Sequence, residues 1–436
     1  MLMQMQMQTK DSQPILRKVL WLVLAIVSAS CMEFYVAHIW SADQPPHFSD
    51  LYAPWWGAHE LLLHDRDPYA PAVAHEIQTM IYGVPVAAAY RGDSSELTGG
   101  FAYPLYAAFL LWPAIYVPFS IAQVLFFFLS ILVTLASLVL WLRGFRFHVT
   151  PVQLLTFALF TLGSFPALQG IRLQNLSLIA AVLLAAAVAL LTTEHLTLAG
   201  IFLAASTFKP QFTLVLVPWL ALWTLSDWRR RQSLAWSFLA SMLLLVGGSE
   251  WLLPGWIGRF LEVVQAYRQY TFGRSLLDVW FTPPAAPFIA AALLLAVLAL
   301  CWKYRRHPAN SQGFFLCTSL VLAATLVVIP TLAPHAQLLL LPGALCLFRY
   351  RDELWRSSQF ARLLLFAVCF LLAWPWVTAT GLTLAATVLP LRSLLRWWEL
   401  PLYTSPLTPL AVLLALGCLI RARTWPADQS SRSLPT

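Results

Sequence analysis

Long apolar runs, separated by short polar segments, follow one another along the whole chain. After a first run at 19–40, further runs lie at about 104–118, 120–142, 152–168, 175–192, 199–224, 234–253, 280–302, 313–330, 337–348, 360–378 and 405–420. A run of about 20 apolar residues crosses a bilayer as a helix. Residues 380–397 fit either a span or an interfacial helix. The pattern therefore predicts an all-α integral membrane protein with about 11–13 transmembrane helices.

The composition leads to the same class. Hydrophobic residues make up 60% of the 436 residues and charged residues only 11%, against roughly 25% charged in a soluble protein. A soluble enzyme, a secreted disulfide scaffold and a disordered regulator are thereby excluded. The six cysteines lie in or beside apolar runs without paired spacing, which favours buried thiols over disulfides or a zinc site.

The net charge of +8 is spread over short basic clusters between the apolar runs, at 17–18, 229–231, 303–306, 349–356 and 421–423. Such clusters are typical of cytoplasmic loops, so they predict contact with membrane lipids and not with nucleic acid. One conflict remains in this topology. If 104–118 crosses the membrane, Arg143 and Arg146 fall on the outer side. Short runs such as 104–118 and 337–348 fit equally a tilted helix, a re-entrant segment or a segment covered by protein.

The longest hydrophilic segment, 41–100, carries eight acidic residues and only two arginines. Because it follows one span from a basic N-terminal segment, it is predicted to be extracytoplasmic. A second external loop is expected at about 254–279. We expect one transmembrane domain at 19–420, between a cytoplasmic segment 1–18 and a tail 421–436.

Two amphipathic helices are predicted within the first loop. The first has an apolar stripe of Leu51, Trp55, Ala58 and Leu62, with His59, Glu60 and His64 on its other side. The second begins at Pro71, has the stripe Val73, Ile77 and Ile81, and ends at Gly83. Juxtamembrane helices of this kind are suited to receiving a lipid-linked substrate.

The sequence has no glycine-rich phosphate loop, which argues against a nucleotide as substrate. A transferase in this membrane would need a donor that is already activated, such as a sugar on a polyprenyl phosphate. Its phosphate leaves without protonation, so the protein must supply one carboxylate base and cationic groups for the phosphate. No His/Cys ligand motif is present, and we predict neither a metal nor a cofactor.

Asp50 is the best candidate for the base, at the start of the first loop helix. On residue type alone, the N-cap of that helix is its more common role. Asp65 and Asp67, beside Pro68, are typical of a turn.

Three other groups are candidates for binding the substrate. Lys209 lies inside the run 199–224, where an ammonium needs a partner or an aqueous cavity; the alternative is a snorkelling or locally paired lysine at a Pro210 kink. His335, in a short turn, is either a structural hydrogen bonder or a substrate contact. The arginines of loop 254–279, which include Arg259, Arg268 and Arg274, fit lipid headgroups or a substrate phosphate.

Together these pieces resemble glycosyltransferase family 87, within the GT-C superfamily of polyprenol-phosphate-sugar-dependent membrane enzymes. The resemblance runs from about Val19 to His335. It is carried by Asp50 and the following Leu-rich aromatic helix, Asp67-Pro68-Tyr69, Tyr103-Pro104, Gln174-Asn175, Ala199-Gly200 to Phe208-Lys209-Pro210, and Pro334-His335.

The resemblance implies a GT-C-type helix bundle in the bacterial plasma membrane with an extracytoplasmic active site. It implies that Asp50 is the general base of an inverting transfer of a hexose, most often mannose, from a polyprenyl-phosphate donor to a glycolipid or glycan. On that basis Lys209, with Arg268 or Arg274, is expected to hold the phosphate, and His335 to position donor or acceptor. Tyr69, Tyr103, Gln174 and Asn175 complete the expected substrate-binding set.

Two other functions remain open at this point. A transporter or flippase of a lipid-linked or small polar substrate would also carry intramembrane charges. The absence of visible internal repeats and the large acidic loop argue against it. A structural protein that retains the scaffold without activity is the third possibility.

Overall fold

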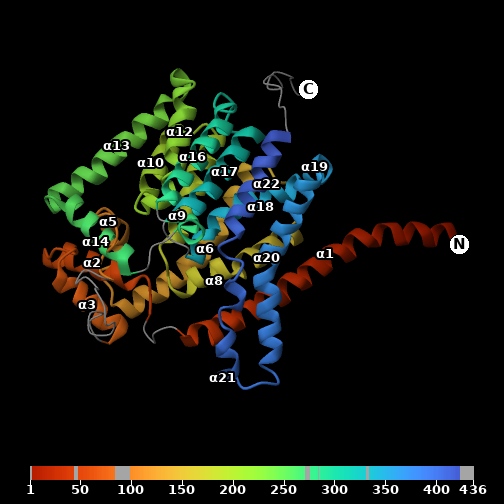
Figure 1. The fold of residues 1–436 in the computed structure, drawn as a ribbon, viewed down its shortest axis with the longest axis horizontal. Coiled ribbons are helices and arrows are strands. Elements are labelled where there is room, and N and C mark those ends of the chain that lie inside the picture. The colour runs from red at the N-terminus through yellow and green to blue at the C-terminus, as the bar shows by residue number, and fades with distance from the viewer. Residues whose placement is uncertain are drawn as a thin grey trace.

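The computed structural model describes residues 2–43, 48–83, 99–270, 275–282, 284–329 and 333–422. All regular elements in these ranges are helical, as predicted. Helix α1 (Leu2–Phe34) continues as a π-helical turn (Tyr35–Trp40) and extends away from the rest of the molecule at its N-terminal end (Figure 1).

Five described helical segments are long and apolar enough to cross a membrane. They are Leu16–Trp40 of α1 and its continuation, α6 (Phe119–Gly144), α13 (Trp228–Leu252), α16 (Ala285–Trp302) and α20 (Gln359–Ala385). Helices α7 (Pro151–Leu162) and α8 (Phe165–Arg172) form a further apolar pair, bent by 62°. The shorter apolar helices are α9 (Ser177–Thr192), α10 (Leu196–Ser206), α12 (Leu216–Leu225), α17 (Gln312–Val328) and α22 (Thr408–Ala422). The polytopic all-α class is confirmed, and the number of spans stays a prediction.

The short apolar run at 104–118 does not form a membrane-spanning helix. This segment forms only a short helix, α5 (Ala107–Leu111), and a 3₁₀ turn (Trp112–Ala114), which are too short to cross a bilayer. Three prolines, Pro104, Pro113 and Pro118, interrupt the run, and proline removes a backbone donor that a continuous helix needs. The conflict over Arg143 and Arg146 disappears with this span.

The run 199–224 is mostly apolar but is not one helix. It divides into α10, the single turn α11 (Pro210–Thr213) and α12, with the break at Lys209-Pro210. The run 337–348 likewise divides, into a 3₁₀ segment η4 (Pro334–Leu340) and α18 (Leu341–Arg349). Of residues 380–397, the first part continues α20, and the rest forms α21 (Leu391–Leu394) and a 3₁₀ turn (Leu395–Trp397). The chain between α18 and α20 forms α19 (Arg351–Ser357), and 3₁₀ turns lie at Ser41–Asp43 and Leu400–Leu402.

The centre of the bundle is α17, whose residues from Gly313 to Val327 are all buried. Helices α12, α16, α18 and α22 pack around it. The opposite environment is found on α13, where Leu244 is 76% exposed and Trp251 is 85% exposed. Exposed apolar side chains on a long apolar helix are suited to contact with lipid acyl chains. The exposed fraction of the side chains therefore indicates which helices face the bilayer.

The two predicted loop helices are present as α2 (Tyr52–His64) and α3 (Pro71–Tyr82). Val73 and Ile77 on the predicted stripe are buried, and Gly83 ends α3 with a φ of 77°, a left-handed conformation that glycine adopts without strain. Both helices lie with α5 and α14 (Trp256–Tyr270) at one end of the molecule (Figure 1).

Candidate active site

Asp50 is not the N-cap of α2, contrary to the role that its residue type favours. The cap position is Leu51 and has no side-chain cap bond, while the Leu51 amide donates to Ser49 Oγ at 3.3 Å. The Asp50 backbone amide donates to the Leu173 carbonyl at 2.9 Å. This bond fixes the start of the loop helix against the end of α8 and leaves the Asp50 carboxylate available for other contacts.

Asn175 joins the Asp50 carboxylate to the Lys209 ammonium. Its Nδ2 donates to Asp50 Oδ2 at 2.6 Å, and its Oδ1 accepts from Lys209 Nζ at 3.0 Å. The same Oδ1 accepts from the Ser177 backbone amide at 2.8 Å, which orients the side chain at the start of α9. The NH2 group of the Asn175 amide thus faces the carboxylate, and its oxygen faces the ammonium, which is the favourable orientation. We call Asp50, Asn175 and Lys209 the Asp50 site.

Lys209 occupies the break between α10 and α11 and is only 6% exposed, so it does not snorkel. Its ammonium donates to Ser177 Oγ at 2.9 Å as well as to Asn175, and lies 5.3 Å from the centre of the Tyr103 ring. These partners are 34 and 32 residues away in the chain, so Lys209 is not paired locally at the Pro210 kink. Asn175, just before α9, links the ammonium to Asp50.

The surroundings of Asp50 shift its protonation equilibrium. Desolvation by the surrounding protein raises the pKa of Asp50 above its ordinary value of 3.8, while the Asn175 hydrogen bond and the Lys209 charge act in the opposite direction. A carboxylate with a raised pKa is a stronger base than an exposed one. The site thus offers a basic oxygen with a fixed positive charge nearby.

His335 lies close enough to the Asp50 site to feel its charge. Burial, together with the positive charge of Lys209, lowers the pKa of His335 to about 3, so the imidazole is neutral. Its backbone amide donates to Gln169 Oε1 at 3.0 Å. The buried Nδ1 atom has no hydrogen-bond partner among the described residues, and a buried polar atom of this kind is ready to bind a substrate group.

Gln174 and Tyr69, two of the predicted substrate contacts, form hydrogen bonds to other parts of the protein. Gln174 adopts a left-handed backbone with a φ of 51°; its Oε1 accepts from Ser49 Oγ at 2.8 Å, and its Nε2 donates to the Arg172 carbonyl at 2.7 Å. Tyr69 donates its hydroxyl to the Tyr103 carbonyl at 2.8 Å. In this structure Gln174 and Tyr69 therefore hold the segments that carry Asp50 and Tyr103.

The predicted arginines are not part of the described site. Arg259 donates to Asp67 Oδ2 at 2.7 Å, and Asp67 also accepts from the Tyr69 amide at 2.9 Å, as expected for a turn. Arg274 and the side chain of Arg268 lie outside the described residues. Their contact with a phosphate stays a prediction.

Sequence reasoning missed Ser177 and Gln169. Ser177 contacts the ammonium, and Gln169 fixes the backbone of His335. The only available signal was a polar residue inside an apolar run, for Ser177, or directly after one, for Gln169. Such a residue needs a hydrogen-bond partner when it is buried, but the sequence does not identify that partner.

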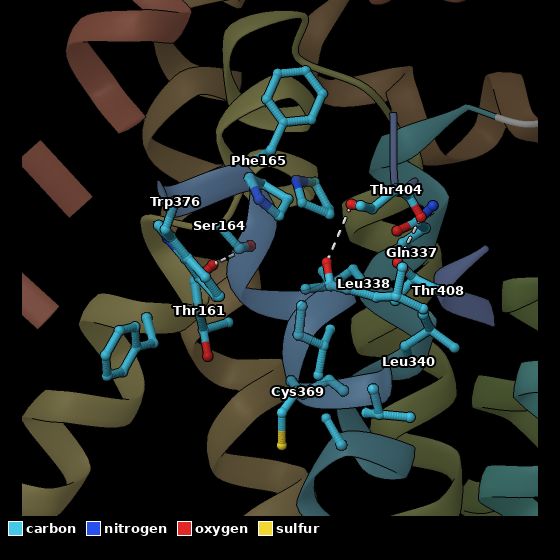
Figure 2. A pocket seen from close by; sticks show the side chains of 18 of the residues that line it. Thr161, Ser164, Phe165, Gln337, Leu338, Leu340, Cys369, Trp376, Thr404 and Thr408 are labelled. Atoms are coloured by element: carbon cyan, nitrogen blue, oxygen red, sulfur yellow. Dashed lines mark hydrogen bonds between the residues drawn. The ribbon is translucent and has the colours of Figure 1, made fainter. Parts of the chain in front are cut away.

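A cavity of about 420 Å³ lies beside the segment that carries His335. Figure 2 shows its wall, to which α7, α8, η4, α18 and α20 contribute. Pro334 and Gln337 both line it, and Gln337 is held by a bond to Ser405 Oγ at 2.7 Å. The other lining residues are mostly apolar, and the volume is within the range of about 300–1,000 Å³ that is usual for ligand sites.

The fold and these residues define an integral membrane protein with a buried acid–amide–ammonium site at one end of its helices. The chain matches glycosyltransferase family 87 over residues 101–330. Since this match covers more than half of the sequence, the chain belongs to that family and is a membrane glycosyltransferase, which uses a sugar donor and an acceptor. No significant match to a curated protein or to a solved structure was found.

The matched range contains Tyr103, Asn175 and Lys209 but neither Asp50 nor His335. The structure brings these parts together, because Asn175 inside the range bonds directly to Asp50 outside it. The transporter alternative does not fit a glycosyltransferase family.

Proposed function

We propose that this protein transfers a hexose, mannose in the first place, from a polyprenyl-phosphate-linked donor to a hydroxyl of a glycolipid or glycan. The observation that carries the proposal is the Asp50–Asn175–Lys209 chain of hydrogen bonds. It holds a base and a cation on the two ends of one amide. A transfer with a phosphate leaving group needs both, one at the acceptor and one at the donor.

In the proposed reaction, Asp50 takes the proton of the acceptor hydroxyl as its oxygen bonds to the anomeric carbon. The bond from that carbon to the phosphate oxygen breaks, and the polyprenyl phosphate leaves with the electron pair. One displacement inverts the configuration at the anomeric carbon. An ammonium has three N–H donors; Asn175 and Ser177 engage two of those of Lys209, and the third is assigned to a phosphate oxygen.

His335 and the neighbouring cavity supply the remaining recognition. A neutral imidazole whose Nδ1 has no partner within the described part of the chain suits a sugar hydroxyl or a phosphate oxygen. The apolar cavity beside Pro334 gives the hydrocarbon chain of the donor a position next to this group. The transfer step drawn in this way needs no metal or cofactor.

We assign the reaction to the extracytoplasmic face of the plasma membrane. If 16–40 crosses outward from a basic N-terminal segment, the acidic loop with Asp50 is outside. Because 104–118 does not form a span, α6 then crosses inward, and the Arg143 of its last turn is on the side that the positive-inside rule expects.

The test is transfer by the purified protein in liposomes from radiolabelled polyprenyl-phosphate mannose to an envelope glycolipid extract. Asp50→Asn should lower the rate by about 10²–10⁴-fold with little change in donor affinity. Asp65→Asn is the matched control, since Asp65 is exposed and has a φ of 53° that asparagine tolerates. Near-normal turnover by Asp50→Asn would remove Asp50 from the mechanism. Parallel assays with polyprenyl-phosphate glucose and galactose would identify the donor sugar.

A further inference from the structure

A second group of polar side chains gathers at the end of α2, away from the Asp50 site. It consists of His59, Glu60, His64, Arg66 and Glu76, and we call it the Glu60 cluster. From Tyr52 to Glu60 the helix rises by roughly 12 Å, so this cluster and Asp50 lie at opposite ends of α2. Nothing in the proposed transfer uses it.

Three atoms of the cluster converge on one point. The Nδ1 atoms of His59 and His64 each lie 3.1 Å from the same oxygen of Glu60, Oε1. Each of the three residues offers one ligand atom, and these ligand atoms all lie within 4.8 Å of one another. Ligands around a tetrahedral zinc ion, with bonds of about 2.0–2.1 Å, are separated by roughly 3.3 Å. The observed spacing therefore matches a set of ligands to one ion after small side-chain adjustments.

The side chains are held in this arrangement by their neighbours. Glu60 is only 3% exposed, and the His59 ring stacks on Trp56 with 5.1 Å between ring centres. His64 is the last residue of α2 and is half exposed, so an ion has access from solvent. A rigid inner side and an open outer side are what a binding site for a small ion requires.

The charges of the cluster also favour a cation. Arg66 pairs with Glu60 Oε2 and with Glu76, its Nη2 lying 2.6 Å from Glu76 Oε1. Two carboxylates therefore surround one guanidinium, and the net charge is negative while the imidazoles are neutral. Arg66 occupies Oε2 of Glu60 and leaves Oε1 to the histidines.

We propose that His59, Glu60 and His64 bind one divalent ion of the zinc class, with a fourth position open to water. Two imidazole nitrogens and one carboxylate oxygen are a donor set that zinc prefers. The ion would fix the end of α2 and the following turn, which carries Asp67 and Tyr69. The sequence predicted no metal because these residues follow no standard ligand spacing; the side-chain geometry assigns the site.

The test uses the full chain in detergent, stripped with a chelator and titrated with Zn²⁺ alone. Calorimetry and metal analysis should give one ion per chain. His64→Ala should weaken binding by at least about tenfold, whereas His195→Ala, which removes an exposed imidazole elsewhere, should bind as the wild type does. Co²⁺ added to the wild type should give the visible absorption of a four-coordinate site, a result that depends on no variant.

Two outcomes would overturn the proposal. Absence of stoichiometric Zn²⁺ uptake by the wild type means that the cluster is a hydrogen-bonded ion network only. Uptake that His64→Ala leaves unchanged puts the ion elsewhere. Neither outcome bears on the transfer reaction, because none of these measurements depends on activity.

Discussion

The Asp50 site and the Glu60 cluster lie at the two ends of the same helix, yet they are built in opposite ways. Asp50 bonds to Asn175, which is 125 residues away in the chain, and Asn175 bonds to a lysine 34 residues further on. In the Glu60 cluster, Glu60 bonds to His64 four residues away and to Arg66 six residues away. One site is assembled by the packing of distant helices. The other is formed by α2, the turn that follows it and Glu76 of the next helix, α3.

The difference shows what each site can contribute. A carboxylate and an ammonium taken out of water are costly unless they are bonded, and the proposed transfer uses both. A local network at a helix end mainly positions the chain around it. Substitutions in the first should affect transfer, and substitutions in the second should affect stability.

Lys209→Met should give the largest effect among the variants that keep Asp50. It preserves the apolar stem but removes the charge assigned to the phosphate, so the donor KM should rise about 10- to 100-fold with a smaller fall in kcat. Lys303→Met, at an exposed lysine, is the control. Steady-state kinetics with varied donor concentration measure the effect, and an unchanged donor KM contradicts the phosphate assignment.

Asn175→Leu should lower transfer at neutral pH by about tenfold and change its pH dependence. The Asn175 bond lowers the pKa of Asp50 against the effect of burial, so the pKa rises further in the variant. In the proposed reaction ionised Asp50 is the active form, so activity should be lost as the pH falls through this pKa. The acid limb of the pH–rate profile should therefore move to higher pH.

Gln123→Leu is the comparison for this profile, since Gln123 contacts Gln174 at 3.3 Å and not the carboxylate. Its acid limb should coincide with that of the wild type. If Asn175→Leu also leaves the limb in place, another group sets the pH dependence.

Arg66→Met should have the smallest effect on transfer, within a few-fold of wild type. It leaves the buried Glu60 carboxylate without its guanidinium and should lower the free energy of unfolding by about 1–3 kcal/mol. Thermal unfolding in detergent measures this loss. Arg351→Met removes an exposed pair at 3.8 Å and should cost less than about 1 kcal/mol; equal losses in the two variants would mean that the cluster does not stabilise the loop.

Much of this protein was predictable from the sequence. Apolar runs define the membrane class, and periodic stripes with Pro71 and Gly83 at the ends locate α3, because these signals act over a few residues. The residue types of the Asp50 site were also recognisable, since a lysine in an apolar run demands a partner.

Only the tertiary structure decided how these parts meet. In it, 104–118 forms no span, Asp50 does not cap α2, and Asn175 links Asp50 to Lys209. It also turned His59, Glu60 and His64 toward one point. Local patterns fix where helices form, whereas contacts between distant residues, and the directions of side chains at a helix end, depend on how the whole chain packs.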